Sequence, residues 1–296
     1  MSEILHLTSG DRAGVLLEEA GVPGEVFVWH DVLYDGPREP GWPDEGILRA
    51  RSGFLEGMTG GGLPREKIYE TLVRQYGELE KVAEFQRPLV LWFDACLFDQ
   101  SMLAHLLSCL AERDAEGVEL LCIDGFPGIE PYNGLGQLKA GDLLSVYDRR
   151  QPVDADEYAF AEEVDSALAT QDADALAAIA DLKEAPLRWM PAAIRRWLQE
   201  QPDPFTGLGR LESLALGAVQ KGISEPGAIF REVQSRDTPP QYWGDITLWA
   251  KINGLAEREP ALVRIEGPAD RLPQWESDHE LNAFQVFPME NGQLEN

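Results

Sequence analysis

The sequence is poor in the residues that build disulfide frameworks and in the apolar runs that cross membranes. Its only cysteines are Cys96, Cys109 and Cys122, an odd number without a C-x-x-C pair. This disfavours a disulfide scaffold or a zinc site and predicts a reducing cytoplasm. No apolar run approaches the roughly 18 residues that a membrane-spanning helix needs. Residues 1–4 lack the start of a signal peptide, so we expect a cytoplasmic protein without a membrane segment.

Basic residues are also scarce. The chain has 25 Lys and Arg against 52 Asp and Glu, a net charge of −27 over 296 residues. This balance disfavours binding to nucleic-acid phosphates and to anionic membranes. Only residues 205–266 approach neutrality, with 7 basic and 8 acidic side chains. Hydrophobic residues make up 44%, which is enough to bury a sizeable core.

Several motifs that mark enzyme classes are absent. The sequence has no G-x-x-x-x-G-K-[ST] loop, no H-E-x-x-H and no G-x-S-x-G elbow. Gly134-Leu135-Gly136 lacks the third glycine and the preceding strand of a dinucleotide-binding fingerprint. Any site must therefore be built from other residues.

The first 150 residues alternate between short apolar runs and helical patterns. Runs typical of strands lie at 4–8, 26–29, 89–93 and 118–123. They do not alternate with polar residues, which favours strands covered on both faces. Helical periodicity fills 11–20, 46–58, 64–83 and 98–111. We predict an α/β (Rossmann-like) domain over 1–150, with a mainly parallel, helix-covered sheet.

The rest of the chain has a different character. Residues 151–204 are rich in alanine and acidic side chains and predict an all-α bridge whose acidic runs form a solvated face. Residues 205–266 predict three helices and a strand, the pattern of a winged-helix-like module. Its third helix offers only Lys251 as a cation, which disfavours DNA binding. Residues 267–296 predict an acidic extended tail.

Polar side chains follow each predicted strand of the first domain. They are Asp11, His30, Asp31, Asp94 and Asp124. The carboxyl ends of parallel strands share one edge of a sheet, where ligands bind. Crowded carboxylates repel one another, a cost that is tolerated for a metal, a cationic ligand or acid–base chemistry. We expect a site at this edge.

Roles can be assigned to these residues, and each also has a structural explanation. His30 or Asp31 would be the acid–base group, Asp31 and Asp94 would hold a hard cation such as Mg²⁺, and Asp11, Asp94 and Arg51 would bind the ligand. Alternatively, Asp11 is a helix N-cap, Asp31 a turn residue, His30 a satisfied histidine, Asp99 a helix-dipole charge and Arg51 a surface residue.

Four segments together resemble a known family. They are Thr8-x-x-Asp11, WHDVLYDGP (29–37), LWFDACLFDQ (91–100) and GLGQL (134–138), and they are similar to the bacterial family called domain of unknown function 1835. The resemblance covers roughly residues 3–150, and the remainder is similar to the family's usual helical C-terminal partner. It implies an architecture without a reaction and adds Gln100 to the ligand-binding residues. Cys96 stands where family members often carry an aspartate, which weakens any mechanism that needs a carboxylate there.

Three functions follow as hypotheses. In the first, the sheet edge binds a small ligand, a nucleotide or phosphorylated metabolite, with or without a metal. In the second, the chain is a non-catalytic regulator or adaptor that binds a protein partner through the winged-helix-like module. In the third, it is a DNA-binding regulator, which needs a basic patch that the charge distribution does not supply.

Overall fold

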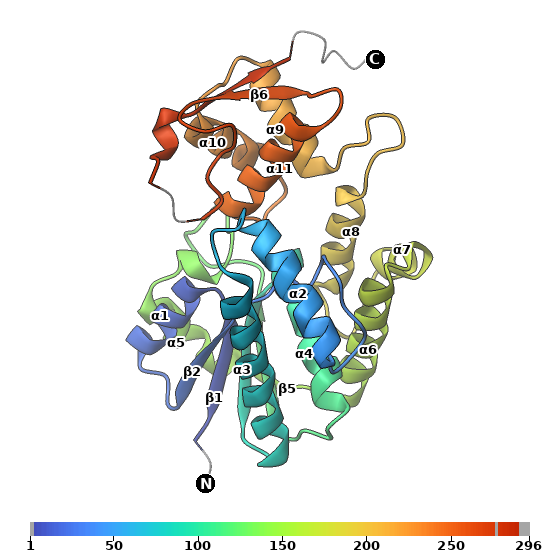
Figure 1. Cartoon of the computed structure of the whole chain (residues 1–296). Helices are drawn as coiled ribbons and strands as arrows, with labels where there is room; N and C mark the ends of the chain where they lie inside the picture. Colours follow the sequence, from blue (N-terminus) through green and yellow to red (C-terminus); the bar gives the residue numbers. More distant parts are fainter. Residues whose placement is uncertain (1–2, 276–277, 290–296) are drawn as a thin grey trace. The chain divides into compact units, whose positions relative to one another are not determined.

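The computed structural model describes residues 3–275 and 278–289 (Figure 1). The chain divides into two compact units. The first, here called the sheet unit, lies within Met1–Phe54 and Glu66–Leu198. The second, called the C-terminal unit, lies within Leu55–Arg65 and Gln199–Asn296. The four-segment division expected from the sequence stays a prediction.

The sheet unit is built on a five-stranded sheet in the order β2-β1-β3-β4-β5. Its strands are β1 (Leu5–Ser9), β2 (Glu25–Trp29), β3 (Leu89–Asp94), β4 (Val118–Ile123) and β5 (Gln151–Pro152). The first four are parallel, and β5 is antiparallel to β4. The predicted mixed α/β class with a mainly parallel sheet is confirmed. All six residues of β3 are buried, which explains why the strand lacks a polar alternation.

The helices of this unit cover both faces of the sheet. They are α1 (Asp11–Ala20), α2 (Glu45–Met58), α3 (Arg65–Glu84), α4 (Leu97–Ala111), α5 (Ala140–Val146), α6 (Ala155–Thr170), α7 (Ala173–Ala180) and α8 (Met190–Glu200), with 3-10 turns at Leu135–Gln137 and Tyr147–Arg149. The chain passes between the two units within α2, after the first residue of α3 and within α8. The crossovers β1-α1-β2 and β3-α4-β4 run in opposite directions along the sheet, so right-handed connections place α1 and α4 on opposite faces. On the first face, α1 and α5 bury Val90 and Trp92 of β3.

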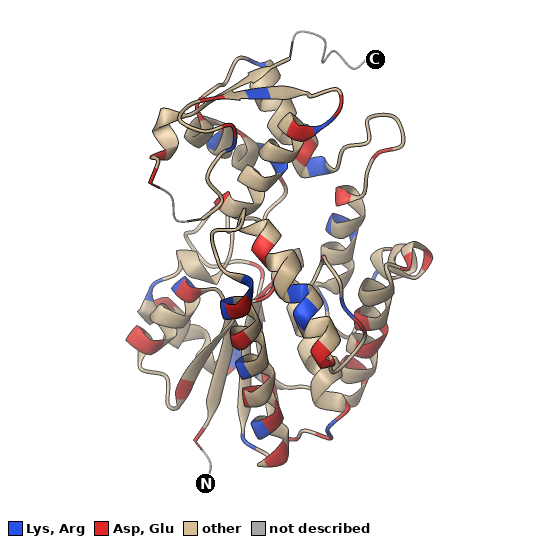
Figure 2. Cartoon of the chain, viewed as in Figure 1, with Lys and Arg blue, Asp and Glu red and all other residues tan. Residues whose placement is uncertain are grey.

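The helices after residue 154 pack with the sheet unit. Helix α6 lies against α4 and begins with a capping box, in which the Asp154 carboxylate accepts from the Glu157 N–H at 2.9 Å. The acidic run of α6 is only partly a solvated face, because Asp165 is completely buried. The expectation that these acidic runs are solvated was therefore wrong for Asp165. Figure 2 shows most other Asp and Glu positions on the helices and loops.

The C-terminal unit contains three helices and a two-stranded antiparallel sheet. Its elements are α9 (Arg210–Gln220), α10 (Pro226–Arg236), α11 (Asp245–Glu257), β6 (Val263–Glu266), a 3-10 turn at Leu281–Ala283 and β7 (Gln285–Pro288). Strand β7 lies in the segment expected as a tail, where it pairs with β6. Tail residues 276–277 and 290–296 lie outside the described residues. That this unit is winged-helix-like stays a prediction.

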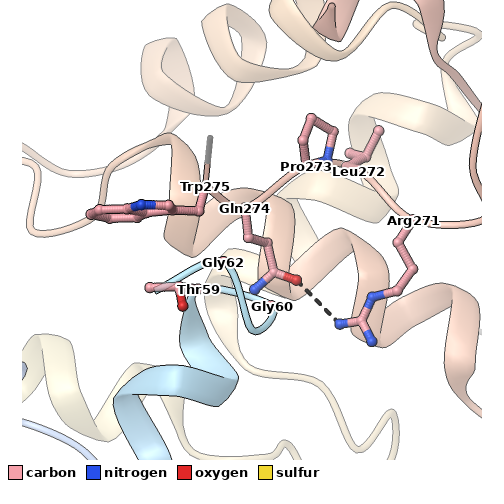
Figure 3. A pocket seen from close by; sticks show the side chains of 8 residues that line it. All are labelled: Thr59, Gly60, Gly62, Arg271, Leu272, Pro273, Gln274 and Trp275. Atoms are coloured by element: carbon pink, nitrogen blue, oxygen red, sulfur yellow. Dashed lines mark hydrogen bonds between the residues drawn. The ribbon is translucent and has the colours of Figure 1, made fainter. Parts of the chain in front are cut away.

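A hollow of about 200 Å³ opens in the C-terminal unit (Figure 3). Thr59 and Gly60 line one side, and Arg271 and Trp275 line the other. Arg271 donates to Gln274 Oε1 at 3.2 Å and pairs with Glu257 at 2.9 Å, so its charge is already compensated. Across the described ranges, no helix is both long and apolar enough to cross a membrane.

Candidate functional site

The strand order shows where the chain reverses the direction in which it adds strands to the sheet. From β1 the chain moves to one side to form β2, and then crosses to the other side to form β3. The topological switch point therefore lies between β1 and β3, at their carboxyl ends. Ser9 ends β1 and Asp94 ends β3, while His30 follows β2 and Asp124 follows β4. Three of the five residues expected from the sequence, His30, Asp94 and Asp124, thus lie at the end of a parallel strand or directly after it, and Asp11 and Asp31 lie two residues beyond one.

Helix α1 begins immediately beyond β1. Gly10 joins the two with φ 74°, a conformation that favours glycine, and within the described residues no side chain caps this helix end. Asp11 is the first residue of α1 and does not act as its N-cap. Its carboxylate instead contacts His30 Nε2 at 2.8 Å, with 83% of the Asp11 side chain and 44% of the His30 side chain exposed.

The backbone of His30 is fixed by α3. Its N–H donates to Gln75 Oε1 at 2.7 Å, and its carbonyl accepts from Gln75 Nε2 at 3.2 Å. Gln75 thereby replaces the neighbouring strand that His30 lacks at the sheet edge. The His30 ring is left accessible beside Asp11 while its main chain is held.

Asp31 and Arg51 form a buried ion pair instead of an open site. Arg51 Nε lies 3.1 and 3.0 Å from the two carboxylate oxygens of Asp31. Arg51 also donates to the carbonyls of Val32 and Pro37, at 2.8 and 2.9 Å. Both side chains are at most 1% exposed. The pair holds the loop that follows His30, and both Asp31 oxygens are occupied by it.

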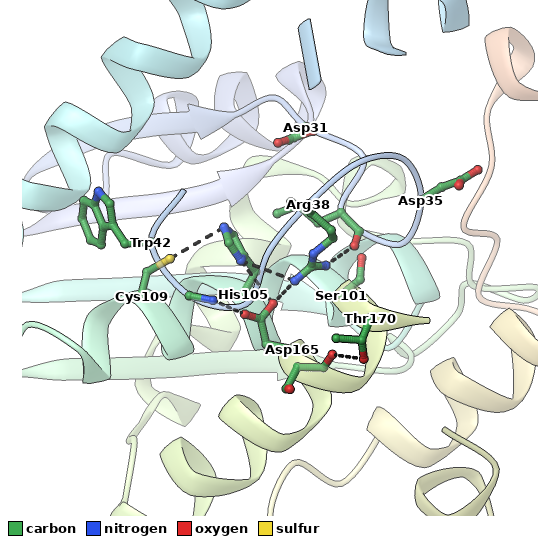
Figure 4. A network of polar contacts seen from close by, with 12 residues as sticks. Asp31, Asp35, Arg38, Trp42, Ser101, His105, Cys109, Asp165 and Thr170 are labelled. Carbon is green, nitrogen blue, oxygen red and sulfur yellow. Dashed lines mark hydrogen bonds and ion pairs between the residues drawn. The ribbon is translucent and has the colours of Figure 1, made fainter. Parts of the chain in front are cut away.

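A second buried arginine closes the same loop (Figure 4). Arg38 pairs with Asp165 of α6, and the Asp165 carboxylate contacts His105 Nδ1 at 3.1 Å. The His105 Nε2 lies 2.6 Å from the Tyr76 hydroxyl. Burial, with the charges of Arg38 and Arg51, holds the pKa of His105 well below its usual value, so this histidine is neutral. Burial and Arg51 lower the pKa of Arg38 to about 10, which leaves it charged near neutral pH.

Sequence reasoning did not find this network. Arg38 lies in a loop, His105 in an apolar helix and Asp165 in an acidic, alanine-rich helix far along the chain. None of these positions carries a pattern of its own. Only the packing of α6 on α4 brings Asp165 to His105 and Arg38.

Asp94 and Asp99 form a different buried cluster at the end of β3. Ser9 Oγ donates to Asp99 Oδ1, the Asp94 N–H donates to Asp99 Oδ2 at 2.7 Å, and the Cys96 N–H donates to Asp94 Oδ1 at 2.8 Å. Burial raises the pKa of Asp94, and burial together with Asp94 raises the pKa of Asp99 well above its usual value. Single ligand atoms of Asp94, Cys96 and Asp99 lie within 4.8 Å of one another.

Gln100 belongs to this cluster. Its Nε2 donates to the Asp94 carbonyl at 2.8 Å and to Cys122 Sγ at 3.3 Å. The cluster also approaches the 3-10 turn after β4, since a methyl group added to Gly134 would lie 2.6 Å from Asp94 Oδ2. Gly134 has φ 128°, so this close approach requires glycine.

The predicted site residues therefore fall into three groups. Asp11 and His30 form an exposed pair, Asp31 and Arg51 a buried ion pair, and Asp94 and Gln100 part of the acidic cluster. The set of closely spaced ligand atoms includes Asp94 but not Asp31. Asp124 is exposed after β4.

Comparison with models of known protein families gave no match to this chain, and comparison with curated proteins gave no similar sequence. The resemblance to domain of unknown function 1835 therefore rests on the four segments alone and stays a prediction.

Proposed function

We propose that the sheet unit binds the phosphate group of a small ligand, such as a nucleotide or phosphorylated metabolite, at the switch point between β1 and β3. The order β2-β1-β3-β4 with parallel strands is that of the flavodoxin-like sheets, in which ligands bind at this point. This is an argument from sheet topology, and the residues at the point supply the chemistry.

The observation that carries the proposal is the uncapped start of α1 at that point. Its first turn offers backbone N–H groups and the positive end of the helix dipole, which together favour a phosphate. A Cβ at Gly10 would meet no atom within 4 Å, so the approach to these groups is open. Arg12 is exposed on the same turn and adds a positive charge.

The remaining predicted residues divide between contact and support. His30 and Asp11 are exposed beside the helix start, and in this proposal both contact the ligand, His30 as the group able to move a proton and Asp11 at a part of the ligand other than its phosphate, because two anions repel. Arg51 and Asp31 act as positioning residues, because they fix the loop that follows His30. Asp94 and Gln100 are buried and reach the switch point indirectly. The Asp99 carboxylate accepts from both the Ser9 hydroxyl and the Asp94 N–H, and Gln100 Nε2 donates to the Asp94 carbonyl.

A matched pair of glycine substitutions tests the phosphate site. Gly10 and Gly21 flank α1 with φ 74° and 67°, and neither would bring a Cβ within 4 Å of another atom. Gly10→Ala and Gly21→Ala should therefore cost similar stability, about 1 kcal/mol. Only Gly10→Ala should also weaken the binding of inorganic phosphate and AMP, by at least tenfold in calorimetric titration.

The same two variants show which results would contradict the proposed phosphate site. Equal phosphate affinity in Gly10→Ala, Gly21→Ala and the unchanged chain would contradict a site at the start of α1. Loss of affinity in both variants would show that general destabilisation, and not the helix start, controls binding.

A second candidate function is partner binding by the C-terminal unit as a regulator or adaptor. The observation that favours it is Phe205, which is 93% exposed before α9 and belongs to the aromatic residues that are enriched at protein interfaces. Phe205→Ser should abolish retention of a partner from lysate by the full-length chain. Phe85→Ser, which changes a 62% exposed phenylalanine of the sheet unit, should leave that retention unchanged. Equal retention by all three proteins would contradict this function.

A further inference from the structure

The sheet unit buries four aspartates, and it compensates only two of them with cations. As whole residues, Asp31, Asp94, Asp99 and Asp165 are 4%, 6%, 2% and 0% exposed. Arg51 pairs with Asp31, and Arg38 pairs with Asp165. Through residues 3–275 and 278–289, neither Asp94 nor Asp99 has an arginine, lysine or histidine within ion-pair distance. Two adjacent buried carboxyl groups without a cation are costly to ionise.

The hydrogen-bond donors to these two carboxyl groups are all uncharged. They are the Ser9 hydroxyl, the backbone N–H groups of Asp94, Cys96 and Leu135, and the Cys96 thiol. Such donors stabilise a carboxylate, but they do not balance its charge as Arg51 does for Asp31. The Asp94–Asp99 cluster therefore lacks the positive charge that arginine supplies to Asp31 and to Asp165.

Two further buried oxygen atoms at this cluster have no hydrogen-bond partner among the described residues. They are Gln100 Oε1 and the Tyr132 hydroxyl. Gln100 is 1% exposed and Tyr132 is 6% exposed. The Gln100 carboxamide lies against the cluster, because its Nε2 is bonded to the Asp94 carbonyl. The Tyr132 side chain is buried and lies close enough to Asp94 and Asp99 for their charges to act on its hydroxyl. Buried oxygen atoms of this kind are rarely left unsatisfied.

We propose that Asp94, Asp99 and Gln100 Oε1 bind one hard divalent cation of the Mg²⁺ type, with the Tyr132 hydroxyl as a partner for its bound water. A hard cation prefers oxygen ligands and keeps several waters, which matches the carboxylate, amide and phenol oxygens gathered here. The ion does for Asp94 and Asp99 what arginines do for Asp31 and Asp165.

The Cys96 sulfur is not a ligand in this assignment. It is buried and accepts the Asp99 N–H at 3.4 Å as the N-cap of α4. Zinc would favour the thiolate form of this residue, whereas Mg²⁺ has no preference for sulfur. The cation site is independent of the proposed phosphate site, because it can be measured with the metal alone.

Titration of the EDTA-treated full chain with MgCl₂ and CaCl₂ tests the proposal. Calorimetry should show one ion per chain, and the melting temperature should rise by roughly 5 °C at a free metal concentration of about 100 Kd. Asp99→Asn should abolish this rise while the chain stays folded, because the amide removes a buried charge and keeps the side chain's shape. Gln100→Met, which replaces the carboxamide with an uncharged thioether of similar length, should weaken binding at least tenfold.

Two controls separate the site from general effects. Asp124→Asn removes an exposed carboxylate at the same sheet edge and should leave the metal affinity unchanged. Cys96→Ser should also leave Mg²⁺ affinity unchanged. The proposal is overturned if neither metal binds the unchanged chain, if Asp99→Asn still responds, or if only Zn²⁺ binds and Cys96→Ser abolishes that binding.

Discussion

Two regions of the sheet unit bury acidic side chains in opposite ways. In the loop after β2, Asp31 pairs with Arg51, and Asp165 of α6 pairs with Arg38. At the end of β3, Asp94 and Asp99 lie together with uncharged donors only. The first arrangement fixes a loop by internal charge balance. The second leaves two negative groups whose balance must come from a proton or from a bound cation.

The difference separates structural acids from acids available to a ligand. A buried aspartate held by arginine on both oxygens, as Asp31 is, has little capacity left for a metal or substrate. A buried aspartate pair without a cation carries a cost in the empty state that a bound cation can offset. By this criterion the candidate metal ligands are Asp94 and Asp99, and Asp31 is a positioning residue.

The largest expected effect comes from breaking an arginine pair. Arg38→Met removes the arginine partner of the buried Asp165, which keeps only its contacts with His105 and the Gly41 N–H, and should lower the free energy of unfolding by about 3–5 kcal/mol. Urea denaturation of the purified variant measures the change. Arg49→Met provides the control, because its pair with Glu45 is exposed and should contribute less than about 1 kcal/mol. A cost for Arg38→Met as small as that of Arg49→Met would contradict the role of the buried pair.

Removing a charge at the aspartates that have no arginine partner should instead raise the free energy of unfolding. Without metal, Asp99→Asn removes repulsion with Asp94, so the free energy of unfolding should rise by about 1 kcal/mol at pH 7. Urea denaturation in EDTA tests this. A clear loss of stability would mean that the ionised Asp99 carboxylate stabilises the fold, and the contrast between the two regions would fail.

The pH dependence of stability gives a further test of the contrast between the arginine-paired aspartates and the Asp94–Asp99 cluster. The pKa of Asp99 is raised from 3.8, so the folded state binds its proton more tightly than the unfolded state does. This contribution to stability is greatest below pH 3.8 and is lost as pH rises through the higher folded pKa. In EDTA, the loss of stability between pH 4 and 8 should be smaller in Asp99→Asn than in Asp124→Asn. Identical slopes in both variants would show that Asp99 does not titrate in this way.

The smallest effect is expected at the exposed pair. Asp11 and His30 lie 2.8 Å apart at the surface, so Asp11→Asn should change the free energy of unfolding by less than about 1 kcal/mol. The same variant should raise phosphate affinity, because the Asp11 carboxylate lies on the first turn of α1 and repels an anion bound there. Thermal denaturation and phosphate titration of one preparation compare the two effects. A large stability loss with unchanged affinity would make this pair structural.

The sheet was predictable because burial on both faces leaves a direct signal in the sequence. The run at 89–93 is apolar throughout, and the structure buries every residue of β3. Strand β5 has only two residues and β7 lies in an acidic segment, so neither carries a strand pattern. Their pairing is set by contacts with β4 and β6 that no local propensity encodes.

For the candidate residues, only their position at one edge of the sheet was predictable. Parallel strands bring their carboxyl ends to one edge, which placed Asp11, His30 and Asp94 there. The partners of the buried acids were not predictable, because Asp165 and Arg38 meet through the packing of α6 on α4. A single sequence also gives no sign of whether an aspartate such as Asp99 faces an arginine or another carboxyl group.

The central claim is that the aspartate pair without arginine holds a cation, and a crystal structure with Mn²⁺ tests it most directly. Mn²⁺ takes the oxygen ligands that Mg²⁺ takes and can be located by its anomalous scattering. The account predicts one peak about 2.0–2.6 Å from oxygens of Asp94 and Asp99, with Gln100 Oε1 as a further ligand. An empty cluster at saturating Mn²⁺, with the two carboxyl groups sharing a proton, would contradict it.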